Sequence, residues 1–398
     1  MKVIILTGEP FPNGMAATNR IKCYAHAIKE GGIDCEVLIF RRTEVYGKQP
    51  KNVDGQGTFE GILFRFIGGT PLRGSHAIIR QLNDRVDAWR TKKYLNRNLQ
   101  KGDVLFFYMG EYVKLMLRFM SIARKKGAFC VQNLDELPYG TSAETKRAIQ
   151  LRKTTLEQQL PKIDGVISIS DALFDLAKRH TRPSCKHIKV PIMVEYNRYC
   201  IKESLQPEIP YIFHAGTLSQ QKDGILGMLE AFGMAKKKLN KPIKYILTGN
   251  IETSSHPEEL RQIIQKYNLE DSVEFVGYLN RDQIREYLAN ATLVISNRPK
   301  SQQDYYGFST KVGEYLASGT PLLMTNWGEA VNWLENGRSA YIIEPEDTDA
   351  LADAIVHVFT HPEESKQIGI TGQEVCRQCF DYRNWSKPIV DFFNQLGN

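Results

Sequence analysis

The residues best suited to chemistry lie in residues 306–321, a stretch with the pattern of a loop, a short helix and a stop signal. Ser309 or Thr310 is placed to cap the start of the helix, and Gly319 followed by Pro321 ends it. A helix N-terminus presents N–H groups without intrahelical partners and the positive end of the helix dipole, which suits a pyrophosphate. The segment therefore predicts an anion-binding helix start.

Two charged side chains extend this prediction. Glu314 falls one turn inside the helix, on the same face as Thr310 and Lys311. A carboxylate there can accept hydrogen bonds from two ribose hydroxyls. A Lys311–Glu314 pair is also an ordinary contact on a helix surface, so the pattern alone leaves both interpretations open.

A second candidate loop, residues 8–20, follows the first apolar run of the chain. It lacks the G-x-G-x-x-G pattern of dinucleotide-binding proteins. Gly14, just before a predicted helix, would let backbone N–H groups approach a phosphate or a sugar hydroxyl. Simple turn geometry explains a glycine at this place equally well.

Residues 306–321 resemble the nucleotide-sugar motif of the large retaining glycosyltransferase family 4, roughly E-x-F-G-x-x-x-x-E-A-x-A-x-G-x-P. Glu314 matches the second glutamate, which holds the donor ribose in that family. Tyr306 stands where the first glutamate, which contacts the sugar, is expected. The resemblance places these further residues in the donor site: Phe308, Ser309, Thr310 and Lys311.

The resemblance extends over nearly the whole chain. Residues 214–224 are similar to the family's G-R-L-x-x-x-K-G, whose arginine and lysine bind the diphosphate. Gly216 and Lys222 match, whereas Thr217 replaces the arginine. Gly277, with Tyr278, matches the loop that contacts the base.

The resemblance implies the GT-B fold, in which two Rossmann-like domains face each other across a cleft. It also implies retaining transfer of a sugar, in which the leaving diphosphate itself helps to take the acceptor proton and no enzyme nucleophile is needed. Positive charge must then stabilise the developing phosphate, and Lys222, Lys311 or Arg298 would supply it. Lys222, Glu314 and Asp135 are the residues expected to be catalytic.

Asp135 enters because the chain departs from the family near it. The family commonly places a histidine beside the donor sugar, but residues 131–138 contain none. Asp135 or Glu136 would take a nearby role, or would merely cap a turn. His214, on a predicted strand, fits a core residue better than a catalyst.

A metal-dependent enzyme of this kind would carry a D-x-D motif. The only match, Asp347-Thr348-Asp349, directly precedes a helical pattern and fits a helix cap. We therefore expect no metal ion and no permanently bound cofactor, only a UDP- or GDP-linked sugar as the donor.

The elements that must position these residues alternate between apolar runs and helical patterns. The runs lack polar alternation, which is typical of a parallel sheet covered on both faces. Expected strands are residues 3–6, 35–40, 104–108, 129–132, 165–170, 211–216, 244–249, 272–277, 291–296, 321–324 and 339–343. Expected helices are residues 17–30, 112–126, 171–179 and 224–238.

Length supports two domains, because 398 residues exceed what one hydrophobic core usually serves. We expect an acceptor-binding domain over residues 1–195, with a linker at about 191–209. A nucleotide-sugar-binding domain follows over residues 196–375. Residues 376–398 form a helical, aromatic tail that packs back on the first domain.

Charge divides the chain unequally: residues 1–195 hold 32 Lys/Arg and 19 Asp/Glu, and the remainder holds 20 and 26. A basic first half suits a polyprenyl-phosphate-linked or glycan acceptor, or peripheral contact with the anionic inner membrane face, or simply solubility. No nucleic acid is expected as a partner. Seven scattered cysteines and the absence of a signal peptide or membrane span indicate a cytoplasmic location.

The expected activity is thus glycosyl transfer in the biosynthesis of a cell-surface polysaccharide or lipopolysaccharide. Two alternatives remain open. One is a non-catalytic subunit that binds a nucleotide sugar, suggested by Tyr306 and Thr217 at two family positions. The other is an epimerase of nucleotide sugars on the same fold, for which the sequence offers no clear acid/base set.

Overall fold

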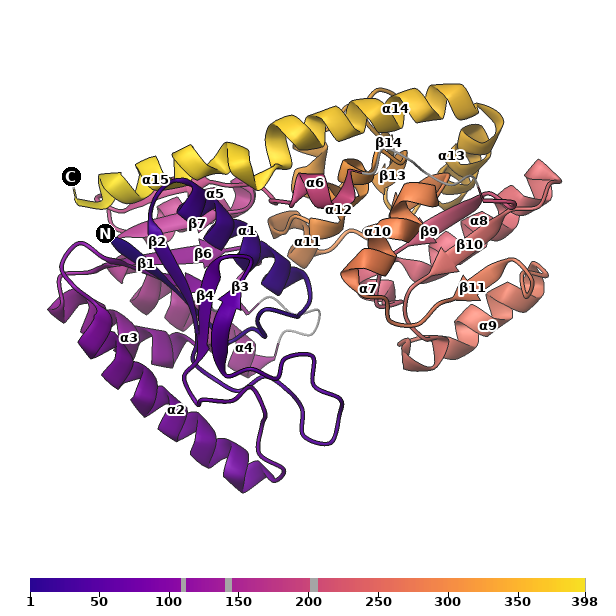
Figure 1. The fold of residues 1–398 in the computed structure, drawn as a ribbon. Helices are drawn as coiled ribbons and strands as arrows, with labels where there is room; N and C mark the ends of the chain where they lie inside the picture. Colours follow the sequence, from indigo (N-terminus) through magenta and orange to yellow (C-terminus); the bar gives the residue numbers. More distant parts are fainter. Residues whose placement is uncertain (109–111, 140–144, 201–206, 398) are drawn as a thin grey trace. The chain divides into compact units, whose positions relative to one another are not determined.

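The chain divides into two compact units, and the bounds of both differ from those of the expected domains. The structure, a computed structural model, describes residues 1–108, 112–139, 145–200 and 207–397. One unit comprises Met1–Met193 with Tyr382–Asn398, and the other comprises Val194–Asp381 (Figure 1). Residues 376–381, expected in the tail, thus belong to the second unit. Part of the expected linker, residues 201–206, lies outside the described residues.

The first unit is built on a sheet of eight strands in the order β3-β4-β2-β1-β5-β6-β7-β8. All neighbours are parallel except β3 and β4. Because β2 and β5 flank β1, the strand order reverses there, as in doubly wound sheets. The strands are β1 Lys2–Thr7, β2 Asp34–Ile39, β3 Gln56–Phe59, β4 Ile62–Phe66, β5 Val104–Tyr108, β6 Phe129–Leu134, β7 Gly165–Ser168 and β8 Lys186–Lys189.

Helices cover this sheet, and the last of them comes from the C-terminus of the chain. The Ser386 hydroxyl donates to the Ala27 carbonyl at 2.7 Å, and Ile389, Phe392 and Phe393 join the core formed by β1, β2 and β5. The helices are α1 Ala16–Glu30, α2 Ala77–Asn98, α3 Val113–Lys125, α4 Lys146–Thr154, α5 Asp171–His180 and α15 Ser386–Asn394.

The second unit has a fully parallel sheet in the order β11-β10-β9-β12-β13-β14. Its strand order reverses at β9, between β10 and β12. The strands are β9 Tyr211–His214, β10 Lys244–Leu247, β11 Val273–Phe275, β12 Leu293–Ser296, β13 Leu322–Thr325 and β14 Tyr341–Ile343. The helices are α6 Tyr196–Tyr199, α7 Gln220–Asp223, α8 Ile225–Leu239, α9 Pro257–Lys266, α10 Arg281–Asn290, α11 Gln302–Tyr306, α12 Thr310–Ser318, α13 Thr348–Thr360 and α14 Pro362–Val375.

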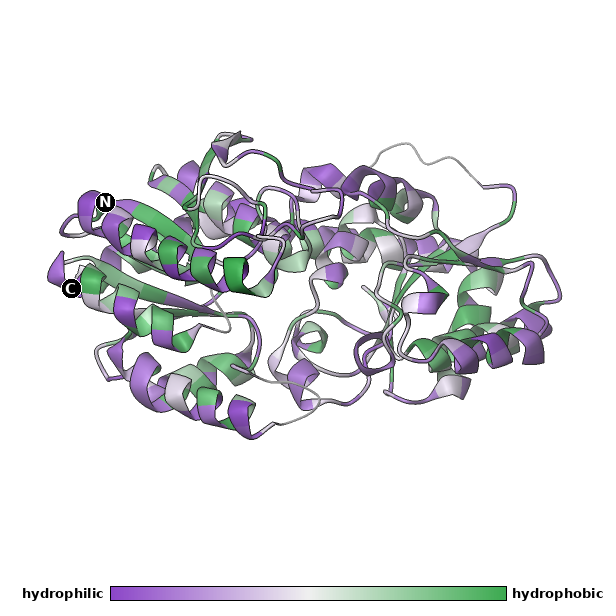
Figure 2. Ribbon diagram, turned by 90° about the horizontal axis from the view of Figure 1, so that it is seen from below, coloured by the Kyte–Doolittle hydropathy of each residue, from purple (hydrophilic) through white to green (hydrophobic). Residues whose placement is uncertain are grey.

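The central strands explain why the sheets are parallel. Every residue of β5 and of β12 is buried, so these strands need apolar side chains on both faces. Figure 2 shows the strands mostly in the hydrophobic colour, whereas the helices carry stripes of both colours. The predicted α/β class with parallel sheets is confirmed.

The cysteines contribute to packing rather than to a cross-linked framework. All seven lie in the described part of the chain, and none forms a disulfide. Of the CxxC pair, Cys376 is buried and its Sγ lies 3.4 Å from the Gly313 carbonyl oxygen. The motif therefore helps to seat residues 376–380 against α12.

Candidate functional site

The candidate site lies where the strand order of the second sheet reverses. Ligands of open parallel sheets bind outside the carboxyl ends of the strands at such a point. β9 ends at His214 and leads into the loop that carries Gly216 and Thr217, while β12 ends at Ser296, just before Arg298. The start of α12 adjoins this loop, since Lys311 contacts Asp223 from across the site.

Polar contacts hold the backbone of the loop after β9. The Gly216 N–H donates to Thr248 Oγ1 at 2.8 Å, and the Asn297 amide donates to the Gly224 carbonyl at 3.1 Å. A side chain at Gly216 would meet His214 Nε2 at 2.3 Å, so only glycine fits against the buried imidazole. The loop is thus fixed by the fold before any ligand arrives.

A buried ion pair joins this loop to α12. The Lys311 ammonium donates to Asp223, which is 2% exposed, and the Thr217 N–H donates to the other oxygen of Asp223 at 3.4 Å. Burial by itself would raise the pKa of Asp223, but Lys311 and His214 outweigh it and lower that pKa below its usual value. The carboxylate is therefore ionised and holds Lys311 beside the Thr217 backbone.

His214 completes this cluster at the end of β9. Its side chain is 1% exposed, and its Nδ1 lies 2.9 Å from the Ile295 carbonyl oxygen. Its Nε2 lies 3.6 Å from Asp223 Oδ1. The imidazole therefore acts within the protein, on Asp223 and on the packing of Gly216.

The helix start has the expected position but not the expected cap. Ser309 is the N-cap residue of α12, yet its side chain makes no capping hydrogen bond. As predicted, Gly319 ends the helix, and its backbone is in the left-handed conformation with φ of 78°. Phe308 is buried against Phe380, with ring centroids 5.6 Å apart. Phe308 therefore anchors the helix start in the core, while the first N–H groups of the helix lack a side-chain cap.

Glu314 sits one turn into α12 beside a buried tyrosine. Burial and the neighbouring Glu314 carboxylate raise the pKa of Tyr199, which keeps its phenol protonated. Arg281 also contacts Tyr199 and pairs with Glu195. The orientation of the Glu314 carboxylate is thus set by groups that sequence spacing did not connect.

Arg298 is held by a carboxylate in the same manner as Lys311. Its guanidinium pairs with Asp304, a residue of α11 that is 6% exposed. The backbone N–H of Arg298 donates to Thr325 Oγ1 at 2.9 Å. The Tyr306 ring, two residues after Asp304, packs edge-on to Tyr305 with centroids 5.2 Å apart. The position that the family fills with glutamate therefore carries an aromatic side chain at the end of α11.

Three other predicted residues, Lys222, Gly277 and Tyr278, lie in loops or short helices and not on α12. The Lys222 side chain is exposed and has no ion-pair or hydrogen-bond partner among the described residues. Gly277 has φ of +72°, and its carbonyl accepts from the Gly249 N–H at 2.7 Å. A positive φ favours glycine there. Tyr278, next to it, is 62% exposed.

The remaining two predicted residues, Gly14 and Asp135, belong to the first unit. A side chain at Gly14 would meet Thr18 Oγ1 at 2.0 Å, so packing against α1 requires glycine. Asp135 follows β6, and its carboxylate accepts from the Tyr108 hydroxyl at 2.5 Å. Burial, reinforced by Asp135, raises the pKa of Tyr108, which keeps that hydroxyl a donor.

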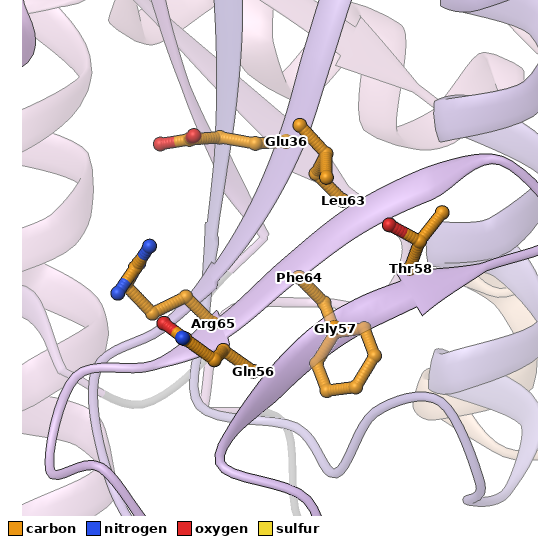
Figure 3. A pocket seen from close by; sticks show the side chains of 7 residues that line it. All are labelled: Glu36, Gln56, Gly57, Thr58, Leu63, Phe64 and Arg65. Atoms are coloured by element: carbon orange, nitrogen blue, oxygen red, sulfur yellow. The ribbon is translucent and has the colours of Figure 1, made fainter.

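A pocket of about 280 Å³ in the first unit is lined by residues of β2, β3 and β4 (Figure 3). Glu36, Gln56 and Arg65 extend to the same side of the sheet from β2, β3 and β4. Lys2 Nζ and the Tyr94 hydroxyl donate to Glu36 at 2.8 and 2.7 Å. The pocket therefore reflects the open edge of the sheet, and its carboxylate is already bound within the protein.

The structure thus brings Gly216, Thr217, Arg298, Lys311 and Glu314 together around one loop and one helix. Sequence reasoning missed Asp223, Thr248 and Tyr315, whose hydroxyl accepts from the Ala215 N–H at 2.8 Å. Asp223 directly follows Lys222, and a charged residue at this place in the motif was a usable signal. No sequence signal connected it with Lys311, 88 residues away.

Comparison with known proteins places this site in a recognised segment. Residues 201–375 match the family model described as glycosyl transferases group 1. The alpha-1,3/1,6-mannosyltransferase ALG2 of Dictyostelium discoideum is 26% identical over 149 residues, 37% of this chain and 34% of that protein. The MMP alpha-(1->4)-mannosyltransferase of Mycolicibacterium hassiacum is 24% identical over 243 residues, 60% of this chain and 55% of that protein. The chain thus spans about a third to a half of these two curated relatives.

Solved structures extend the likeness over the whole chain. The sucrose-phosphate synthase of Thermosynechococcus elongatus has a TM-score of 0.75 at 16% identity, covering 100% of this chain and 99% of its own. HepE of Anabaena, solved with UDP-glucose, has a TM-score of 0.70 at 16% identity, with 99% of both chains covered. At such identity the likeness shows the fold alone, and the GT-B fold expected from the sequence is confirmed.

Proposed function

We propose that this protein is a retaining glycosyltransferase of family 4 that moves a sugar from a nucleoside diphosphate to a glycan or lipid-linked acceptor. The cluster around Asp223 carries the proposal. It holds Lys311 beside the Thr217 N–H and next to the uncapped start of α12. A fixed ammonium beside the uncapped N–H groups of a helix start, at the point of sheet reversal, forms a site for a diphosphate. The family match over residues 201–375 supports it, because the match contains this cluster.

The proposed donor is a UDP- or GDP-linked sugar rather than a permanently bound cofactor. Glu314 lies about one helical turn from Lys311, a spacing that suits a ribose next to a diphosphate. Gly277 and Tyr278 would then border the base. The UDP-glucose complex of HepE, which shares the fold, supports a UDP-linked donor.

Lys222, Lys311 and Arg298 are the cations proposed to stabilise the diphosphate as it leaves. Charge that is fixed in advance costs no reorganisation during the reaction. Lys311 and Arg298 are fixed in this sense by Asp223 and Asp304. Lys222 is the mobile member of the set, and Asp135 is the proposed catalytic group of the first unit.

We further propose that the enzyme is retaining and needs no metal ion. The single D-x-D match supports the second point, because Asp347 Oδ1 accepts from the Ala350 N–H at 2.8 Å and so caps α13. Assays with and without a chelator test metal dependence. The anomeric configuration of the product, read by NMR, tests retention.

The proposed acceptor is a glycan or a polyprenyl-phosphate-linked sugar in cell-surface polysaccharide biosynthesis, with the enzyme at the cytoplasmic membrane face. The basic composition of residues 1–195 supports an anionic acceptor or surface. No nucleic acid partner is proposed.

A non-catalytic subunit that binds a nucleotide sugar is the second candidate. Tyr306 and Thr217 favour it, since they replace charged residues of the family motif. Lys311 argues against it, because it supplies a cation beside the Thr217 N–H.

Titration calorimetry with UDP, GDP and their glucose, galactose, mannose and N-acetylglucosamine conjugates tests the proposal. We expect micromolar binding of one nucleotide series and its loss in Glu314→Ala. Lys366→Ala, an exposed lysine on α14, is the matched control.

Donor turnover then separates the candidates. Release of nucleoside diphosphate, with or without an acceptor, supports a transferase. Binding without turnover supports the subunit, and an isomeric sugar by NMR supports the epimerase. No binding of any nucleotide sugar overturns all three.

A further inference from the structure

Helix α2, Ala77–Asn98, lies on the outside of the first unit and packs on α3 (Figure 1). Only Asp87, Thr91 and Leu95 of its residues are buried. Asp87 is neutralised there by Arg42 and Arg90, whose nitrogens lie 3.3 and 3.7 Å from its oxygens. The helix therefore touches the rest of the unit with a narrow and partly polar side.

The opposite side of α2 carries large apolar side chains in solvent. Ile78, Leu82 and Trp89 are 81%, 58% and 59% exposed. Their spacings of four and seven residues put them on one face of a helix. Such a stripe has no role in the core of the unit and marks a surface that meets something apolar. We call Ile78, Leu82 and Trp89 the apolar stripe.

Basic side chains flank the apolar stripe. α2 holds six Lys/Arg and two Asp, of which Asp87 is buried and paired. Arg85, Lys92 and Lys93 follow stripe residues by three, four or seven positions and so lie beside them. The Lys93 ammonium lies 5.3 Å from the centre of the Trp89 ring. Cations therefore border the exposed apolar groups on the same face.

The apolar stripe and the basic side chains beside it together indicate what kind of partner α2 binds. A second copy docking α2 against α2 would bring the same positive charges together, since a two-fold interface juxtaposes identical patches. Nucleic acid would use the cations but would leave the apolar stripe in water. An anionic lipid surface satisfies both, because an interfacial helix buries its apolar residues at the acyl boundary and its Lys/Arg contact the headgroups.

We propose that α2 lies in the interface of an anionic membrane, with the apolar stripe inserted and Arg85, Lys92 and Lys93 on acidic headgroups. None of the helices in the described ranges is long and apolar enough to cross a bilayer. The inference rests on the membrane contact in the proposed function but not on the transfer reaction.

Cosedimentation of the full chain with vesicles tests the inference. Vesicles of phosphatidylglycerol and phosphatidylcholine are compared with pure phosphatidylcholine. We expect binding to the anionic vesicles only. The charge variant R85E/K92E/K93E should lower the partition coefficient about a hundredfold. The stripe variant I78S/L82S/W89S should lower it at least tenfold.

A matched control separates α2 from diffuse charge. K125E/K126E/K162E changes three exposed lysines of the first unit by the same total charge. It should keep at least a third of wild-type binding. Equal loss in the control and the charge variant overturns the inference, as does failure of the wild-type chain to bind anionic vesicles.

Two further readouts complete the test. If the wild-type chain is a dimer in sedimentation and the stripe variant is a monomer, the stripe belongs to a second copy and the inference is wrong. Nucleotide binding, measured on the same preparations, should be unchanged in all three variants, because the proposed nucleotide site lies in the second unit. A wild-type chain that binds nucleotide but not anionic vesicles contradicts this inference alone. A wild-type chain that binds anionic vesicles but no nucleotide contradicts the proposed function alone.

Discussion

Lysine and arginine side chains have different surroundings in the two units. In the second unit Lys311 and Arg298 each pair with a carboxylate that is almost wholly buried. In α2 of the first unit Arg85 and Lys92 are without such a partner in the described part of the chain. A paired cation has a fixed position and suits a small ligand of fixed shape. A cation in solvent suits a broad charged surface whose details do not matter.

The largest effect on activity is expected at Lys222, which differs from Lys311 and Arg298 because no buried carboxylate among the described residues holds it. Lys222→Ala should lower the rate of transfer by about a hundredfold or more, because it removes a positive charge that stabilises the leaving diphosphate. The melting temperature should not change, since the side chain is exposed and forms no hydrogen bond or ion pair with the described residues. Steady-state assays and thermal melts of Lys222→Ala and of the control Lys366→Ala measure this. Unchanged transfer would remove Lys222 from the site.

Stability separates the two classes of cation next. Asp223→Asn should cost about 3 kcal/mol of unfolding free energy, because it leaves the Lys311 ammonium buried without its countercharge. Asp353→Asn, which breaks an exposed pair with Lys238, should cost less than about 0.5 kcal/mol. Urea denaturation of both variants measures the difference. Equal costs would mean that burial of the Asp223 pair does not matter.

The same pair predicts a dependence on pH. The pKa of Asp223 is lowered in the folded protein, so its contribution to stability is fully present above the unfolded value of about 3.9. It is lost as the pH falls below that value toward the folded pKa. The stability difference between the wild-type chain and Asp223→Asn should therefore shrink on acidification below about pH 4. Urea midpoints at several pH values read it, and a difference that grows on acidification would contradict the assignment.

Salt should distinguish the two surfaces by about tenfold. Raising NaCl from about 0.05 to 0.5 M shortens the screening length from roughly 14 to 4 Å, which weakens exposed charges most. Vesicle binding through α2 should fall at least tenfold, and nucleotide binding about threefold or less. Equal salt dependence would show that the cations of the second unit act as exposed charges as well.

The smallest effect concerns Asp347, a carboxylate that caps a helix and forms no ion pair within the described ranges. Asp347→Ala should cost about 1 kcal/mol, because it removes the cap of α13. Asp349→Ala, an exposed residue in the first turn, should cost less. Transfer should be equal in both variants and insensitive to a chelator. A chelator-sensitive activity that Asp347→Ala abolishes would instead assign a metal site to the D-x-D sequence.

The sequence located most of the fold because its signals were local. Residues 104–108 and 293–295 are apolar without interruption, and both became part of buried central strands. α2 gave no such signal, since its buried side consists of Asp87, Thr91 and Leu95 and its apolar residues face solvent. The β3–β4 hairpin was missed as well, although Glu60 and Gly61 form a two-residue turn with φ of 47° and 78°. An edge hairpin with half its residues in solvent lacks the continuous apolar run of a parallel strand.

In the candidate site, too, the local features were predictable from the sequence and the contacts between distant segments were not. The sequence by itself determined that a short helix begins near Thr310, that it ends at Gly319 and that Glu314 lies one turn inside, because these follow from spacing along the chain. Only the tertiary structure decided that Asp223 holds Lys311, that Asp304 holds Arg298 and that Tyr199 lies beside Glu314. The sequence predicted that the tail packs back on the first domain, and the tertiary structure decided which of its side chains, Ile389, Phe392 and Phe393, enter the core. A helix period repeats every few residues and can be read locally, whereas the partner of a buried charge is chosen by which distant segments the fold brings together.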